Sequence, residues 1–256
     1  MSQTNNVVLV TGAGGGAGKA IAKAYFEAGA HVFVSDLKKP EWVLNETNTN
    51  GRLLPIELNV TDEHSVQNAI KQINDTTSGI NVLVNNAGIS IESPIHETAL
   101  NTWEKMFSVN STGVFLCTRE VVKSMLANKR KGSIINISSI AGRNAFPGAA
   151  GYCASKAAVL GFTRSLAVEL GEHDITVNAI CPGSVETPMI ENVIENISLN
   201  TGMSKEEARK MMESGIPLKR FQKPEDVASL ALFLSSEYAR NITGESINLD
   251  GGVVRN

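Results

Sequence analysis

The apolar positions of this chain fall into short continuous runs that alternate with segments of helical periodicity. Continuous runs of Val, Ile and Leu are typical of strands that are covered on both faces. Helical patterns follow most of these runs, and they are expected at 17–28, after Thr61-Asp62-Glu63, at 112–128, near 205–213 and from Pro224. The seven runs that we expect to be strands are 7–10, 31–35, 52–58, 81–84, 133–137, 175–180 and 246–249.

Alternation of strands and helices predicts an α/β fold, a doubly wound parallel β-sheet with helices on both faces. No low-complexity linker divides the chain, so we expect residues 1–256 to form a single domain. The segment 184–217 follows the sixth strand and is long for a connection. Long insertions at the carboxyl end of a strand often serve as lids, and we expect one here.

The helix expected at 112–128 carries two apolar stripes instead of the one that a helix on a sheet needs. The first is Val114, Val121 and Met125, and the second is Phe115, Val122 and Leu126. The second stripe indicates either a subunit interface or burial under a neighbouring helix.

Composition narrows the class of protein. The 256 residues include 42% apolar residues, and the net charge is −3 with mixed signs, so nothing suggests a nucleic-acid partner. Three scattered cysteines, Cys117, Cys153 and Cys181, favour neither a disulfide scaffold nor a metal site. The polar N-terminus shows no signal peptide, and no apolar stretch is long enough to span a membrane. We expect a cytoplasmic protein without a metal.

A glycine-rich loop, Thr11-Gly12-Ala13-Gly14-Gly15-Gly16-Ala17-Gly18, lies between the first strand and the first helix. Such glycines let the backbone approach a pyrophosphate, and the helix N-terminus then offers N–H groups and a positive dipole end to it. A nucleotide triphosphatase is disfavoured, because Lys19 is followed by Ala20 where a P-loop needs Ser or Thr. The loop therefore predicts dinucleotide binding.

Asp36 ends the second strand, 18 residues after Gly18 (36 − 18). A carboxylate there accepts hydrogen bonds from ribose hydroxyls and repels a 2′-phosphate. NAD is therefore favoured as cofactor and NADP is less favoured, although Lys38 and Lys39 nearby soften this choice. The other interpretation of Asp36 is a helix-capping or loop carboxylate.

Tyr152 and Lys156 are four residues apart in an expected helix, so they lie on one face. A tyrosine with a pKa of about 10 is a poor acid–base catalyst near pH 7, and a neighbouring cation lowers that pKa. The pair is therefore either a tunable proton donor and acceptor or a chance surface pair.

Together these motifs resemble the short-chain dehydrogenase/reductase family, with its NAD(P)-binding Rossmann fold, over essentially the whole chain. The matching features are the glycine loop, Asn85-Asn86-Ala87-Gly88, Asn110, and Ser139 placed 13 residues before Tyr152-x-x-x-Lys156. Pro182-Gly183 followed by Thr187 and Asp250-Gly251-Gly252 also match. Asn59 is a departure, because many members have Asp there.

The resemblance implies a cofactor site and a catalytic group. The residues expected to bind cofactor are Gly12, Gly14, Gly15, Gly16, Ala17, Asp36, Leu37, Asn59, Val60, Asn86, Ala87, Gly88, Tyr152, Lys156, Pro182, Gly183, Val185 and Thr187. The expected catalytic residues are Asn110, Ser139, Tyr152 and Lys156.

By resemblance, each catalytic residue has a distinct role. Tyr152 moves the proton, Lys156 lowers the pKa of Tyr152 and binds the nicotinamide ribose, and Ser139 holds the substrate oxygen. Asn110 either holds a water in a proton relay or is a buried Asn that bonds only to backbone. Asn59 keeps a contact with adenine through its carbonyl oxygen, and Ser138 is expected to bond to backbone.

The expected substrate contacts are Ser139, Tyr152, Arg143 and Ser184, and Arg143 is alternatively an outward-facing loop residue. The resemblance also implies a homotetramer, or a dimer, through helix 112–128 and the Tyr152 helix.

Three functions compete. The first is an NAD-dependent oxidoreductase acting on a small secondary alcohol or ketone, of the polyol, sugar, diol or hydroxy acid type. The second is a 3-oxoacyl-[acyl-carrier-protein] reductase, which more often uses NADPH. The third is an NAD(H)-sensing or scaffolding homologue without activity, although such proteins commonly lose the Tyr, Lys or Ser that this chain retains.

Overall fold

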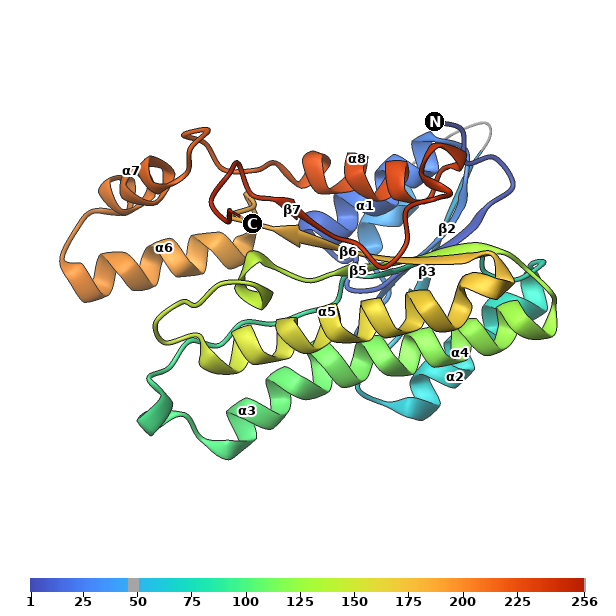
Figure 1. Cartoon of the computed structure of the whole chain (residues 1–256), viewed down its shortest axis with the longest axis horizontal. Helices are drawn as coiled ribbons and strands as arrows, with labels where there is room; N and C mark the ends of the chain where they lie inside the picture. The colour runs from blue at the N-terminus through green and yellow to red at the C-terminus, as the bar shows by residue number, and fades with distance from the viewer. Residues whose placement is uncertain (46–50, 256) are drawn as a thin grey trace.

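The computed structural model describes residues 1–45 and 51–255, and a seven-stranded parallel sheet forms its centre (Figure 1). The strand order is β3-β2-β1-β4-β5-β6-β7, so the sheet grows outward from β1 in both directions. This order confirms the predicted doubly wound α/β fold, and the strand ends differ from the expected ones by no more than one or two residues. The strands are β1 Val7–Val10, β2 His31–Asp36, β3 Arg52–Glu57, β4 Val82–Asn85, β5 Gly132–Ile137, β6 Ile175–Pro182 and β7 Ser246–Leu249.

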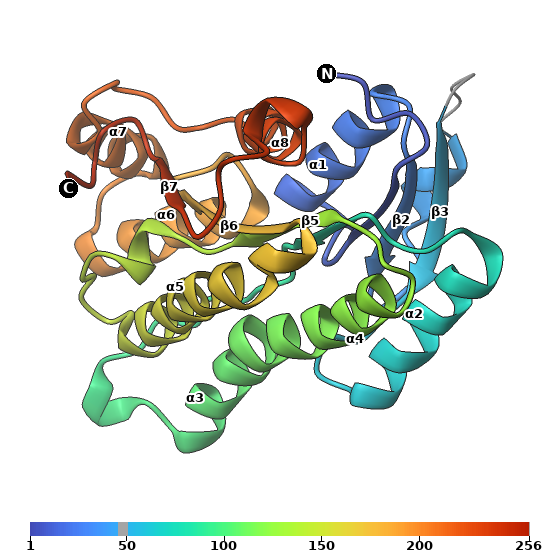
Figure 2. The same ribbon diagram turned by 45° about the vertical axis from the view of Figure 1, so that its right-hand side comes forward.

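Helices cover both faces of the sheet, as Figure 2 shows. On one face α1 (Gly16–Glu27) and α8 (Pro224–Leu234) bury their apolar sides against the central strands. On the other face, three helices bury their apolar sides against the strands: α2 (Glu63–Thr76), α4 (Gly113–Ala127) and α5 (Ala150–Leu170). Each apolar cluster uses the Val, Ile and Leu side chains that the strands project to that face, as the sequence predicts.

A chain of buried polar side chains joins the second of these faces to the sheet. The amide nitrogen of Asn85 donates to Thr118 on α4 and to the Asn136 side-chain oxygen on β5, both at 2.9 Å. The amide nitrogen of Asn136 in turn donates to Thr163 on α5 at 2.9 Å. Hydrogen bonds of this kind fix the lateral position of α4 and α5 over the carboxyl ends of β4 and β5.

The helix expected at 112–128 is the last part of a longer helical segment. It consists of α3 (Leu100–Phe107), a π-helical turn (Ser108–Thr112) and α4. A π turn inserts an extra residue into the helix and often occurs at functional sites. Asn110 lies in this turn, and its side chain is fully buried.

The two apolar stripes of α4 have different environments. Val114, Val121 and Met125 are buried against the sheet, whereas Phe115 and Leu126 of the second stripe are 41% and 39% exposed. Val122 of the same stripe is partly buried against the core, so Phe115 and Leu126 are the members that lie on the surface, and Phe115 contacts Phe162 of α5. The predicted homotetramer or dimer through this surface stays a prediction.

The segment after β6 contains two helices, α6 (Pro188–Thr201) and α7 (Lys205–Gly215), which lie beyond one end of the sheet (Figure 1). The sequence predicts only α7, because α6 buries a single residue and so lacks a strong apolar period. The two helices share a small apolar cluster, separate from the two clusters of the sheet, formed by Ile194, Ala208, Ile216 and Phe221. We call residues 184–222, which include the expected segment 184–217, the lid segment.

No helix among residues 1–45 and 51–255 is both long enough and apolar enough to cross a membrane.

Candidate active site

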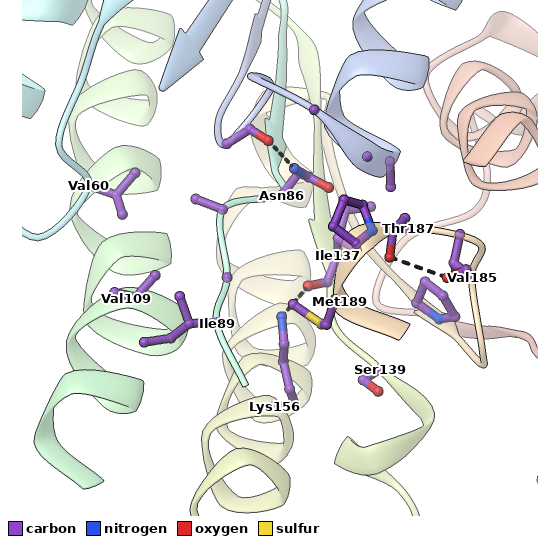
Figure 3. Close-up of a pocket in the computed structure, with 18 of the residues that line it drawn as sticks. Val60, Asn86, Ile89, Val109, Ile137, Ser139, Lys156, Val185, Thr187 and Met189 are labelled. Carbon is purple, nitrogen blue, oxygen red and sulfur yellow. Dashed lines mark hydrogen bonds between the residues drawn. The ribbon is translucent and has the colours of Figure 1, made fainter. Parts of the chain in front are cut away.

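A cleft of about 630 Å³ lies along the carboxyl edge of the sheet, between the strand ends and the lid segment. Figure 3 shows Val60, Val109 and Ile89 on one side of it and Val185 and Thr187 on the other. Most of the predicted site residues line this cleft, namely Gly12, Gly15, Gly16, Ala17, Asp36, Leu37, Asn59, Val60, Asn86, Ala87, Gly88, Ser139, Tyr152, Lys156, Pro182, Gly183, Val185 and Thr187.

The glycine loop is tied to the loop that follows β4. The Thr11 hydroxyl oxygen accepts hydrogen bonds from the backbone N–H groups of Asn86 and Ala87, at 3.0 and 3.1 Å. The Asn86 side chain donates in return to the carbonyl oxygens of Thr11 and Gly12, at 3.0 and 2.9 Å. These four bonds fix the floor of the cleft, because they join the ends of two adjacent strands.

The geometry of the loop fits a pyrophosphate. Gly12 has φ +62°, and a Cβ atom there would lie 2.6 Å from the Cα atom of Ala87, so only glycine permits this contact. Gly15 precedes α1 without a side-chain cap, and a Cβ on Gly15 would meet nothing within 4 Å. The first N–H groups of α1 are therefore left without a capping side chain and face open space, which is the arrangement that binds phosphate groups.

Asp36 stands at the end of β2 and faces the cleft, as predicted. One carboxylate oxygen accepts from the backbone N–H of Gly14 and the other from that of Leu37, both at 2.8 Å. A Cβ atom at position 14 would lie 2.6 Å from the Asp36 carboxylate, so Gly14 and Asp36 fit only each other. Gly14 does not line the cleft itself, and it acts on the cleft by fixing this carboxylate.

Asn59 lines the cleft, but its side-chain oxygen is already engaged. It accepts from the backbone N–H of Thr61 at 3.0 Å and from the Thr61 hydroxyl at 2.8 Å. Because an amide oxygen has two lone pairs, an adenine amino group has to compete for it. The expected adenine contact therefore stays a prediction, and the structure gives it no free acceptor.

Ser139, Tyr152 and Lys156 come together at the centre of the cleft from β5 and α5. The Ser139 hydroxyl caps a short turn by accepting from the Ala141 N–H at 3.1 Å, and it also forms a hydrogen bond with the Tyr152 phenol. The Lys156 ammonium lies 5.8 Å from the centre of the Tyr152 ring and donates to the Ile137 carbonyl oxygen at 2.9 Å. Ser138 donates to the Lys156 carbonyl oxygen at 2.9 Å, which confirms the expected backbone role.

Burial dominates the acid–base properties of this group. It raises the pKa of Tyr152 above its usual range, and the hydrogen bond from Ser139 offsets part of that rise. It lowers the pKa of Lys156 to about 8, because the ammonium is desolvated, and Cys181 nearby offsets this lowering in part. The expected lowering of the Tyr152 pKa by Lys156 stays a prediction, and in this structure the Lys156 ammonium donates to the Ile137 carbonyl and lies 5.8 Å from the centre of the Tyr152 ring. Ser139 is the group that lowers it.

Asn110 connects the loop after β4 to α5 from beneath the cleft. Its side-chain oxygen accepts from the Ile89 N–H, and its amide nitrogen donates to the Ile89 carbonyl and to the Ser155 hydroxyl, at 2.9 to 3.0 Å. It does not line the cleft directly. A Cβ atom at Gly88 would lie 3.2 Å from the Lys156 ammonium and 3.3 Å from the Asn110 oxygen. Glycine at position 88 thus keeps the space between those two groups open.

Two residues predicted to contact substrate, Arg143 and Ser184, are not among the residues that line the cleft. The Arg143 side chain is exposed and donates to the Ser246 carbonyl oxygen on β7. The Ser184 carbonyl oxygen accepts from the Gln222 N–H, which pairs the start and the end of the lid segment. Both residues therefore contact the neighbouring chain segments, and the substrate contacts expected for them stay predictions.

The cleft also contains residues that the sequence does not single out. Pro188, Met189 and Ile190 at the start of α6 line it, and so does Lys105 of α3. The only sequence signal for α6 was the proline, which is favoured at the first position of a helix. Lys105 lies one turn before Val109, on the helix face that also carries the cleft lining.

The arrangement suits proton transfer beside a bound dinucleotide. A nicotinamide cofactor supplies the hydride chemistry when it is bound. The glycine loop and the N-terminus of α1 would provide groups for its phosphates, and Asp36 and Lys156 would bind its riboses. Ser139 and Tyr152 line the same cleft, where their hydroxyl groups would hold one substrate oxygen and exchange a proton with it. Among the described residues, no three His, Cys, Asp or Glu side chains are grouped to hold a metal ion.

Comparison with known proteins gives the same assignment. The model of the short chain dehydrogenase family matches residues 6–198. A 3-oxoacyl-[acyl-carrier-protein] reductase, FabG, from Thermotoga maritima is 38% identical, over 99% of this chain and 100% of its own length. Galactitol 2-dehydrogenase from Agrobacterium fabrum is 34% identical over 98% of both chains.

Among solved structures, sorbitol-6-phosphate 2-dehydrogenase SrlD from Erwinia amylovora superposes with a TM-score of 0.92 and 32% identity, covering 98% of this chain and all of that one. The family match spans most of the chain, and the relatives exceed 30% identity over nearly the whole length. The chain therefore belongs to the short-chain dehydrogenase/reductase family of nicotinamide-dependent oxidoreductases.

Proposed function

We propose that this protein transfers hydride between NAD(H) and a secondary alcohol or ketone, with Tyr152 as the acid and base. The observation that carries the proposal is that Ser139, Tyr152 and the buried Lys156 line the same cleft, with Lys156 one helical turn from Tyr152. Lys156 holds the cofactor ribose, Ser139 positions the substrate oxygen, and Asn110 supports the loop between them. The substrate is a small polyol, sugar, diol or hydroxy acid, or the corresponding ketone.

NAD is proposed over NADP because of Asp36. Its carboxylate is held by two backbone N–H groups on the wall of the cleft, where it accepts the hydroxyls of an adenosine ribose. The same negative charge repels a 2′-phosphate. Leu37, the next residue, is apolar and adds no cation to attract one.

Removing the negative charge of Asp36 tests this coenzyme preference. In Asp36→Ala, the ratio of kcat/KM with NADP to kcat/KM with NAD should rise by roughly 10- to 100-fold, because a like-charge repulsion is removed. Asp36→Asn is the matched control, since it keeps the shape and loses the charge, and it should shift the ratio in the same direction. An unchanged or larger preference for NAD in both variants would place selectivity elsewhere.

A 3-oxoacyl-[acyl-carrier-protein] reductase is the second candidate, and two observations favour it. Relatives of that name are 38% and 40% identical to this chain, and the start of α6 that lines the cleft, Pro188–Ile190, is wholly apolar. An apolar wall suits an acyl chain better than a polyol, which needs hydrogen-bonding partners.

One panel separates the two candidates. The purified protein is assayed by NADH and NADPH absorbance with secondary alcohols, polyols, hydroxy acids and a 3-oxoacyl thioester. The proposal expects NAD-linked turnover of an alcohol or a small ketone with the highest kcat/KM. NADPH-linked reduction of the thioester as the dominant activity would establish the second candidate, and NADH binding without turnover of any carbonyl would refute both.

A further inference from the structure

Arg209 of α7 forms contacts with four parts of the lid segment. Its guanidinium donates to Glu191 in the first turn of α6 at 2.8 Å and lies 3.4 Å from the Glu186 carboxylate, which precedes α6. It lies 3.6 Å from Glu213, one turn further along α7, and 4.9 Å from the centre of the Phe221 ring. A planar guanidinium with five N–H donors is the side chain best suited to such a junction.

The contacts made by Arg209 join the two ends of the lid segment. At the base of the lid, the Glu186 N–H donates to the Gln222 carbonyl and the Gln222 N–H to the Ser184 carbonyl, both at 2.9 Å. Glu186 and Phe221 are therefore the residues beside this backbone bridge. Because Arg209 contacts both, it links the bridge to the outer helices α6 and α7.

The rest of the lid has little to hold it. Its apolar cluster contains four buried residues and does not join the clusters on the sheet, and Ile190 and Ile197 of α6 are partly buried against it. Ile194 is the single buried residue of α6, and Ala208 is that of α7. Lys205 pairs with Glu195 further along α6, so the first turn of α6 is held by the partly buried Ile190 and by the contacts of Arg209 with Glu191 and Glu186.

That first turn of α6 is where the lid enters the cleft. Met189 and Ile190 line the cleft, and Glu191, the next residue, is the one that Arg209 binds most closely. We propose that Arg209 is the positioning residue of the lid. It orients the start of α6 so that Met189 and Ile190 close over the substrate, although it does not touch the cleft itself. This proposal rests on the proposed function, because it assigns the lid to the same reaction.

The kinetic test is Arg209→Gln, which removes the charge and keeps a polar side chain. We expect the KM for substrate to rise roughly tenfold, because three partly exposed ion pairs and a ring contact are lost together. The pH profile of kcat should be unchanged, since Ser139, Tyr152 and Lys156 keep their contacts. Lys210→Gln is the matched control, because Lys210 is adjacent, exposed, and paired only with Glu206 of its own helix. It should leave KM within about twofold of wild type.

A second measurement does not depend on turnover. Amide hydrogen exchange of residues 186–216 is followed with and without NADH, and NADH should slow this exchange in wild type and in Lys210→Gln. In Arg209→Gln we expect faster exchange in this segment alone and a loss of the slowing by NADH. Arg209→Lys retains the charge without the planar fork, and its exchange should fall between the two.

The outcomes separate the two proposals. If exchange in the lid responds as described while no substrate is turned over by wild type, then the proposed function fails and the role of Arg209 in positioning the lid stands. Faster lid exchange in Arg209→Gln with an unchanged KM would overturn the positioning role, because the contacts would then be only structural. Unchanged exchange and unchanged KM would overturn it as well.

Discussion

The Ser139-Tyr152-Lys156 group and the lid segment form opposite walls of one cleft, but they are held in different ways. Lys156 is 4% exposed and Ser139 is 8% exposed, and their polar atoms bond to backbone of β5 and of the short turn that follows it. The lid is fixed by Arg209, whose side chain is 33% exposed, and by a cluster of four buried residues.

Because of this difference, the two walls tolerate substitution and movement to different degrees. Buried hydrogen bonds are strong and costly to break, so the catalytic group has one defined geometry. Partly exposed ion pairs are individually weak and screened by salt, so the lid can open and be replaced without loss of the fold. The chemistry is thus held rigidly, while selectivity for substrate depends on the segment that is easiest to change.

The largest effect is expected on the rigid wall, in Tyr152→Phe. This change removes the hydroxyl that exchanges the proton and keeps the ring, so turnover should fall by roughly 10²–10⁴-fold while the affinity for NADH stays nearly unchanged. Steady-state rates and NADH fluorescence titration measure the two quantities.

Tyr238→Phe is the matched control, since Tyr238 is 80% exposed and lies outside the cleft, and it should behave as wild type. Retention of more than a few per cent of the wild-type rate in Tyr152→Phe would remove Tyr152 as the acid and base.

The rigid wall is also the part that the sequence predicts well. The glycine loop, Asp36 and the Tyr152-x-x-x-Lys156 pair depend on a strand, a tight turn and one helical turn, all of which are local in sequence. Their meeting at one edge follows from the parallel sheet, because carboxyl ends of neighbouring strands share an edge. Most of the predicted site residues accordingly line the cleft, whereas Gly14, Asn110, Arg143 and Ser184 do not.

The sequence predicts that a lid segment exists, but it does not predict which residues of the lid contact one another. Nothing in the order of residues 184–222 relates Arg209 to Glu186, Glu191 and Phe221, because these residues come from separate elements and have no shared period. The orientation of Arg143 was open for the same reason, since its partner, the Ser246 carbonyl, is 103 residues away. The hydrogen-bond partner of the Lys156 ammonium was open as well. The four-residue spacing places Lys156 on the same helix face as Tyr152, but it does not determine that the ammonium donates to the Ile137 carbonyl.

A second pair of substitutions compares how tightly the two regions are packed. Gly12 in the loop after β1 and Gly202 at the end of α6 both have positive φ, +62° and +74°. An alanine costs backbone energy at either position, about 1–2 kcal/mol. At Gly12 the new Cβ also overlaps Ala87, at 2.6 Å, whereas at Gly202 it meets nothing within 4 Å.

Gly12→Ala should therefore lower the free energy of unfolding by about 3 kcal/mol or more, and Gly202→Ala by about 1 kcal/mol. Urea denaturation measures both, and NADH titration should show weaker binding only for Gly12→Ala. Equal losses of stability would mean that the two regions do not differ in packing as the structure indicates.

The smallest expected effect is the pH dependence that a lysine in each wall gives to the free energy of unfolding. Burial lowers the pKa of Lys156 from 10.5 to about 8. Between those values the unfolded chain keeps a proton that the folded chain has released, so this group makes the free energy of unfolding rise with pH from about 8 to 10.5. Below pH 8 both states are protonated, and the full cost of the buried ammonium is present.

Lys156→Met removes this dependence. Between pH 7.5 and 9.5 wild type should gain about 1–2 kcal/mol of unfolding free energy relative to the variant, at up to about 1.4 kcal/mol per pH unit. Groups that titrate in both proteins, such as Cys117, cancel in the difference. Lys210→Met on the lid should show no such change in this range, because its ion pair with Glu206 raises its pKa above the usual value. A constant difference between wild type and Lys156→Met from pH 7.5 to 9.5 would mean that this lysine is solvated like its counterpart on the lid, and the contrast between the two walls would not extend to their electrostatics.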